Sequence, residues 1–76
     1  MTMVTIEKAV LDDLVDFKLK YIVQEMQRIL EHWHYQSADL FLVHARDGTL
    51  KGAEMDAIAL RQLLVNRQKL ESLRKN

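Results

Sequence analysis

Residues 5–35 read TIEKAVLDDLVDFKLKYIVQEMQRILEHWHY and contain neither Gly nor Pro. Those two residues are the usual interruptions of a helix. Apolar side chains recur along this stretch at spacings of three and four residues, which is the period of an amphipathic helix. Residues 5–35 therefore predict one long first helix, with Thr5 as its N-cap.

The apolar side chains of this helix cover more than half of its circumference when they are placed at 100° per residue. The sector has Val10, Leu14, Phe17 and Tyr21 along one edge, Leu11, Val15, Ile22 and Ile29 near its centre, and Met26, Leu30 and Trp33 along the other edge. A single neighbouring helix covers a narrower stripe than this. We therefore expect part of the face to be left for a second chain.

The next segment begins after Ser37, whose side chain can cap a helix over residues 38–46. Leu40, Phe41, Leu42 and Val43 form an apolar run, and Asp47-Gly48 is a typical helix stop. We expect a short helix here. A β-hairpin over residues 38–50 is the alternative, because so short a run has no decisive period.

Residues 53–74 again have a helical pattern. Alternating spacings of four and three separate Ala59, Leu63, Asn66, Leu70 and Leu73, and all of them except Asn66 are apolar. This heptad spacing is typical of helix pairing, and we expect Leu63 and Leu70 to pack inside the hairpin. Asn66 either sets the register of that seam or marks the partly exposed end of an apolar stripe.

These elements predict one all-α domain over residues 1–76, an elongated antiparallel hairpin of a long, a short and a long helix. A first helix of about 30 residues would be about 45 Å long, whereas a compact sphere of this chain length is about 30 Å across. Acidic residues prevail in residues 1–16 and basic residues in residues 61–76. Folding back brings these two ends together, and we expect two such hairpins to form a bundle of four helices.

The composition excludes several classes of protein. The chain has 11 basic and 11 acidic residues, and this balance of charge argues against nucleic acid as a partner. It has no cysteine. It has no apolar run long enough to cross a membrane and no signal peptide, so we expect a cytoplasmic protein with no membrane partner. No disulfide or thiolate metal site stabilises so short a chain, which favours association.

No motif points to catalysis, a cofactor or a metal. His32 and His34 lie 200° apart on a helix, so they cannot hold one ion there, although in an extended segment they would share a face. Neither a P-loop nor a nucleophile turn is present. Trp33, Tyr35 and Phe41 gather where the first two segments join, and we expect them to fill core. A ligand pocket with polar groups from His44 and Arg46 is the alternative.

The sequence thus favours a small helical protein–protein interaction module, a homodimer with a regulatory or adaptor role rather than an enzyme. The residues we expect at the interface or in the core are Leu11, Val15, Ile22, Met26, Ile29 and Trp33. One alternative is a DNA-binding transcriptional regulator, with residues 38–46 and 53–66 as a helix-turn-helix. The other is a small-ligand or enzyme site at the aromatic corner.

Overall fold

The computed structural model describes residues 7–75, which form three α-helices and no strand. Helix α1 spans Lys8–His32, α2 spans Ala38–Asp47 and α3 spans Glu54–Lys75. The predicted all-α order of a long, a short and a long helix is confirmed. The hairpin alternative for residues 38–50 is wrong, because residues 38–47 are helical.

Helix α1 is continuous but ends three residues earlier than residue 35. His34 adopts the left-handed conformation with φ 61°. The Tyr35 N–H donates to the Leu30 carbonyl at 2.8 Å and the His34 N–H to the Glu31 carbonyl at 3.1 Å. These two bonds are those of a Schellman motif, which satisfies the last carbonyls of a helix and turns the chain away. At the other end Glu7 is the N-cap, and the expected cap Thr5 lies outside the described residues.

Helix α2 has the two ends expected from its sequence. The Leu40 N–H donates to the Ser37 Oγ at 3.2 Å, which satisfies one of the free donors of the first turn. Gly48 follows the last residue with φ 88°, a conformation that costs other residues strain. The helix is anchored by Phe41, which has no exposed surface.

Helix α3 packs with a face centred next to the predicted heptad seam. Leu63 and Leu70 pack against the core, as expected. The most deeply buried residue of the helix, however, is Leu60, and Ala53 directly before the helix is equally buried. Ala59 is exposed, and Leu73 is 51% exposed. The expectation that Ala59 and Leu73 line the seam is therefore wrong. Viewed down the helix axis, Leu60 projects between Leu63 and Leu64, and all three are on the side of α3 that packs against the core. Leu60 is therefore at the centre of the packed face.

Asn66 lies at the border of this face. It is half-buried, and its Oδ1 accepts a hydrogen bond of 3.2 Å from Gln62 Nε2 one turn earlier. Its polar atoms thus have a partner on the same helix. This arrangement corresponds to the partly exposed end of an apolar stripe, the second of the two interpretations of its position.

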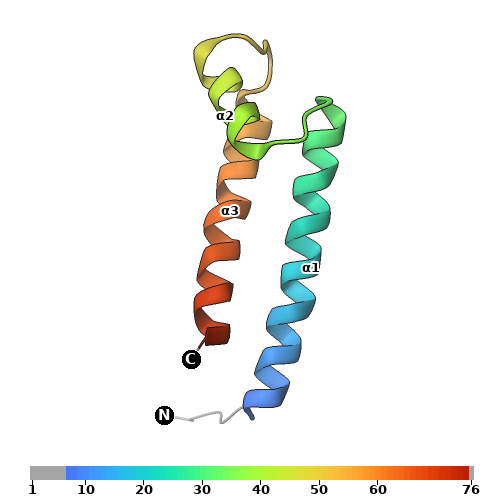
Figure 1. Cartoon of the computed structure of the whole chain (residues 1–76), viewed down its shortest axis with the longest axis vertical. Coiled ribbons are helices and arrows are strands. Elements are labelled where there is room, and N and C mark those ends of the chain that lie inside the picture. The colour runs from blue at the N-terminus through green and yellow to red at the C-terminus, as the bar shows by residue number, and fades with distance from the viewer. Residues whose placement is uncertain (1–6, 76) are drawn as a thin grey trace.

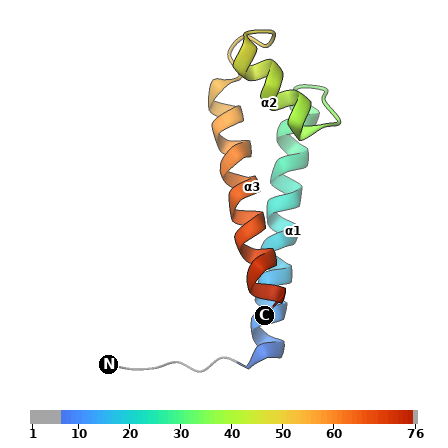
Figure 2. The same ribbon diagram turned by 60° about the vertical axis from the view of Figure 1, so that its left-hand side comes forward.

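The three helices form an elongated rod. Helices α1 and α3 run antiparallel side by side, and α2 lies across one end of the pair, as both views show (Figures 1 and 2). The Cα atoms extend over 49 × 24 × 17 Å with a radius of gyration of 15.7 Å, against about 11 Å for a compact domain of this length. We name the end that holds α2 the closed end, and the end where α1 begins and α3 stops the open end.

The core is concentrated towards the closed end. Its buried members are Ile22, Met26, Ile29, Phe41, Ala53 and Leu60. Val15, 3% exposed, is the buried residue of α1 nearest the open end. The open end consists of two helices alone, because α2 does not reach it (Figure 1). Two layers bury one stripe of each helix, so the rest of the α1 face is uncovered there.

The acidic start and the basic end of the chain meet at the open end, as expected from the order of charges. Arg74 Nη1 lies 2.8 Å from Asp16 Oδ1, and both side chains are about half exposed. An exposed ion pair contributes about 0 to 1 kcal/mol to stability. Within residues 7–75, no helix is both long and apolar enough to cross a membrane.

Candidate interaction surface

The centre of the wide α1 face is used by the chain itself. Val15, Ile22, Met26 and Ile29 have exposed fractions of 1–8%. They were expected as interface or core, and within one chain they form the core. These four side chains are therefore not available to a second chain.

The two remaining expected residues are half-buried. Trp33 packs against the core, and its Nε1–H donates to Asp56 Oδ2 of α3 at 2.8 Å. This bond ties the end of α1 to the first turn of α3 and satisfies the indole donor. Leu11 is half-buried near the open end. Trp33 is thus a link between helices of one chain.

The uncovered part of the α1 face is one straight stripe. Val10, Leu14, Phe17 and Tyr21 are exposed by 48%, 56%, 76% and 48%. Their spacings of four, three and four residues keep them in line along the helix. We name these four residues the outer stripe. They are the edge of the apolar sector that the sequence placed next to Val15 and Ile22.

The outer stripe is an exposed apolar patch with charged side chains along its borders. Its four side chains expose on the order of 450 Å² of mostly apolar surface, which is within the range of the largest patch on a typical monomer. Lys18 Nζ lies 4.7 Å from the centroid of the Tyr21 ring, so one cation already contacts the end of the stripe. Asp13 and Lys20 border it on the other side by helical period. The stripe is therefore apolar along its length and charged on both sides.

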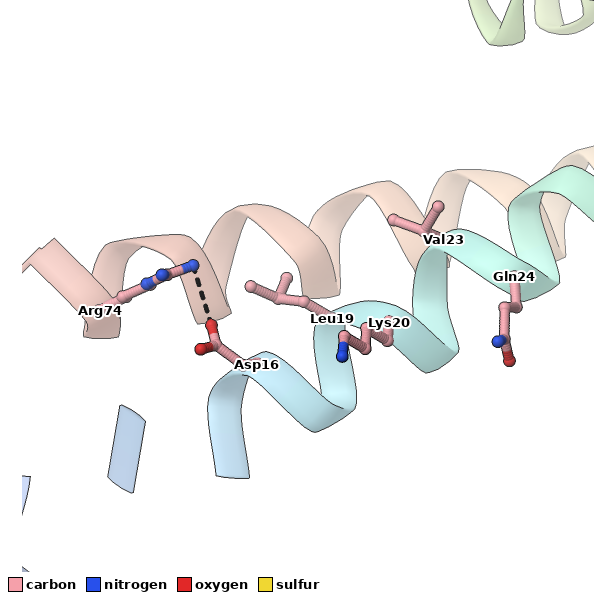
Figure 3. A pocket seen from close by; sticks show the side chains of 6 residues that line it. All are labelled: Asp16, Leu19, Lys20, Val23, Gln24 and Arg74. Atoms are coloured by element: carbon pink, nitrogen blue, oxygen red, sulfur yellow. Dashed lines mark ion pairs between the residues drawn. The ribbon is translucent and has the colours of Figure 1, made fainter. Parts of the chain in front are cut away.

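A shallow groove lies between α1 and the last turn of α3 (Figure 3). By helical period it lies on the opposite side of α1 from the outer stripe. It encloses about 520 Å³ and is lined by Asp16, Leu19, Lys20, Val23, Gln24 and Arg74. The Asp16–Arg74 ion pair bridges the two helices at its edge (Figure 3). None of the lining residues is buried. A small-molecule site buries most of its ligand, and a groove this open does not.

The aromatic corner is filled by its own side chains. The Tyr35 and Phe41 rings make an edge contact at 5.6 Å between centroids, and Trp33 lies 6.1 Å from Phe41. The Tyr35 hydroxyl and His44 Nδ1 are 2.6 Å apart. The polar atoms of this corner thus pair with each other, and Arg46, the other polar group expected there, is exposed. These contacts are those of a core that joins three helices.

Some of the charged side chains of the described residues form ion pairs, most of them between residues three or four positions apart. Arg67 Nε is 2.9 Å from Glu71 Oε1 and Arg74 is paired with Asp16. His32 and His34 are exposed. Among the residues that the structure describes, no group of three or more His, Cys, Asp or Glu side chains is placed to hold a metal ion.

We compared the chain with protein-family models, curated proteins and solved structures, and nothing in the three comparisons matched it. The packing within one chain leaves the outer stripe exposed, and it also leaves Met55 and Ile58 of α3 exposed by 76% and 64%. Sequence reasoning found the four residues of the outer stripe but put the centre of the apolar sector first.

Proposed function

We propose that this chain is a helical protein–protein interaction module that works as a homodimer, in a regulatory or adaptor role. The observation that supports the proposal is the outer stripe. Phe17, at its middle, is 76% exposed, although an aromatic side chain gains more than most from burial. A second helix laid along the stripe would cover all four side chains.

The spacing of the stripe supports a helical partner. Positions four, three and four residues apart form the seam along which two helices pack their side chains into each other. A strand or an irregular loop has no matching period. The partner surface is therefore best supplied by another amphipathic helix.

The charge pattern supports a second copy of this chain as that partner. Asp13 and Lys20 on one side and Lys18 on the other give the same surface both signs of charge. A surface with both signs can complement itself across a two-fold axis, as the interface of a symmetric dimer must. Association also adds stability to a chain whose two-layer end has a small core.

Sedimentation and thermal melting at several protein concentrations test the proposal. We expect a species of twice the 8.9 kDa chain mass at micromolar concentration, and a melting temperature that falls on dilution. A monomer at these concentrations, with melting unchanged by dilution, would contradict the proposal.

A pair of matched variants locates the surface. Phe17→Glu places a charge in the outer stripe, and we expect it to shift the protein to monomer while its helix content is kept, because Phe17 supports no core contact. Met55→Glu is the control, since Met55 has the same exposed fraction of 76% but lies in the first turn of α3 at the closed end. It should leave the dimer intact. Equal loss of dimer in both variants would argue against the outer stripe.

The two alternative functions stay predictions with tests of their own. A DNA-binding regulator would shift DNA in a gel at low salt and lose the shift at high salt. A small-ligand or enzyme site would raise the melting temperature when its ligand is added.

A further inference from the structure

We infer that two copies of the chain pair their α1 helices in antiparallel orientation, with the two-fold axis between residues 15 and 16. Leu14 then packs against Phe17 of the partner subunit, and Val10 against Tyr21 of the partner subunit. This inference rests on the proposed homodimer and adds its geometry.

The outer stripe is bounded by polar residues at both of its ends. The same heptad positions are occupied before the stripe by Glu7 and after it by Gln24, Arg28 and Glu31, all exposed. Only residues 10–21 of this line are apolar. A partner helix therefore gains by covering the first half of α1 and not the second half.

A parallel pair would place each of these positions opposite itself. Arg28 would face Arg28 of the partner subunit, and Glu31 would face the partner's Glu31. Like charges in such positions destabilise a helix pair. The Arg28 Nε–H also donates to Glu25 Oε2 at 2.9 Å within its own helix, and a close parallel neighbour would crowd that ion pair.

An antiparallel pair avoids these contacts. With the axis between residues 15 and 16, the numbers of two residues that face each other add up to 31. Glu7 then lies opposite the partner's Gln24. Arg28 and Glu31 lie outside the region where the two helices overlap. The apolar residues 10–21 then face only apolar residues. The opposed helix dipoles also favour this orientation.

The charges beside the stripe are compatible with this arrangement. Asp13 lies on the same side of the helix as Lys20, and antiparallel pairing brings Asp13 near the partner's Lys20 on both halves of the interface. A parallel pair would instead bring Asp13 near the partner's Lys18. The flanking charges are thus satisfied in both orientations, and the ends of the stripe decide between them.

Disulfide trapping tests the orientation, because the chain has no cysteine of its own. Val10→Cys and Tyr21→Cys variants are mixed and equilibrated in a glutathione redox buffer. We expect the mixed disulfide between the two variants to exceed each homodisulfide several-fold, since antiparallel pairing puts these two positions opposite each other. Predominant homodisulfides would overturn the antiparallel orientation and leave the dimer standing.

Small-angle scattering of the unsubstituted protein gives an independent measurement. Overlap of residues 7–24 spans about 27 Å, so two rods of 49 Å would form an antiparallel dimer with a maximum dimension of roughly 70 Å. A parallel dimer would stay near the length of one rod. A dimer mass with the short dimension would overturn the orientation alone, whereas a monomer mass would contradict the homodimer itself.

Discussion

Phe41 is the residue on which the three helices converge. It is the largest of the fully buried side chains, and Trp33 and Tyr35 pack against it from the end of α1. A chain of 76 residues has few such residues, so each one carries a large share of the stability. The sequence allowed two interpretations of this aromatic corner, a core and a ligand pocket. At Phe41 the corner is core.

We expect Phe41→Ala to lower the free energy of unfolding by about 3 to 5 kcal/mol, because it removes a buried ring and leaves a cavity. Domains of this kind have about 5 to 15 kcal/mol in total, so the variant should unfold at much lower urea. Val43→Ala on the same helix is the control, since Val43 is 43% exposed. Similar losses in both variants would show that Phe41 is not central to the core.

The carboxyl group of Asp47 is expected to make the stability of the fold depend on pH. The hydroxyl and the N–H of Thr49 both donate to Asp47 Oδ1, at 2.6 and 2.9 Å. These two hydrogen bonds lower the pKa of Asp47 below its ordinary value of 3.8. A lowered pKa in the folded state stabilises the fold above the ordinary value, and this contribution is lost as the pH falls through the lowered one.

The Asp47 pKa is measured by NMR titration of its carboxyl carbon. We expect a midpoint below 3.8 in the unsubstituted chain and a shift towards 3.8 in Thr49→Val, because the hydroxyl bond is the largest cause. Identical midpoints in the two proteins would show that this hydrogen bond does not hold the charge.

At the scale of the element, α2 depends on its caps. Its apolar run has no decisive period, yet Ser37 and Gly48 mark its two ends with local hydrogen bonding and a left-handed residue. Local chemistry of this kind does not depend on the rest of the molecule. The apolar run of residues 40–43 suits a helix or a strand equally well, and the caps at its two ends explain why it forms a helix.

Ser37→Ala is expected to lower the free energy of unfolding by about 1 kcal/mol, because the Leu40 N–H loses its acceptor. Ser72→Ala is the matched control, since Ser72 lies exposed inside α3, where Ala is the better helix former. Thermal or urea unfolding of both variants measures the difference. A loss in Ser72→Ala as large as that in Ser37→Ala would contradict the capping role.

At the scale of the whole molecule, the order of the helices leaves only α1 and α3 at the open end of the rod. Helix α2 lies over the closed end only, so the helices at the open end have one neighbour each (Figure 2). The outer stripe lies in this two-helix part of the rod, on a side of α1 that α3 leaves exposed. The same line of α1 is also exposed at the closed end, but there it carries Gln24, Arg28 and Glu31.

The ion pair at the open end is expected to orient the ends of the chain more than to stabilise them. Asp16 and Arg74 are 42% and 55% exposed, so water and salt weaken their attraction. We expect Asp16→Asn to change the free energy of unfolding by less than about 1 kcal/mol, with a still smaller change at high salt. A large loss that persists at high salt would mean that Asp16 has a second role.

The sequence by itself determined the positions of the two long helices to within a few residues and favoured the short helix over a hairpin, because helix breakers, caps and the 3.6-residue period act between residues close in the chain. It also determined that α1 has more apolar circumference than one helix can cover. Only the tertiary structure decided that Val15 and Ile22 are buried while Leu14 and Phe17 are not, and that Leu60 rather than Ala59 lies at the centre of the α3 contact. Such choices depend on how two helices rotate and slide against each other, and that register is set by the sum of contacts between residues far apart in the sequence.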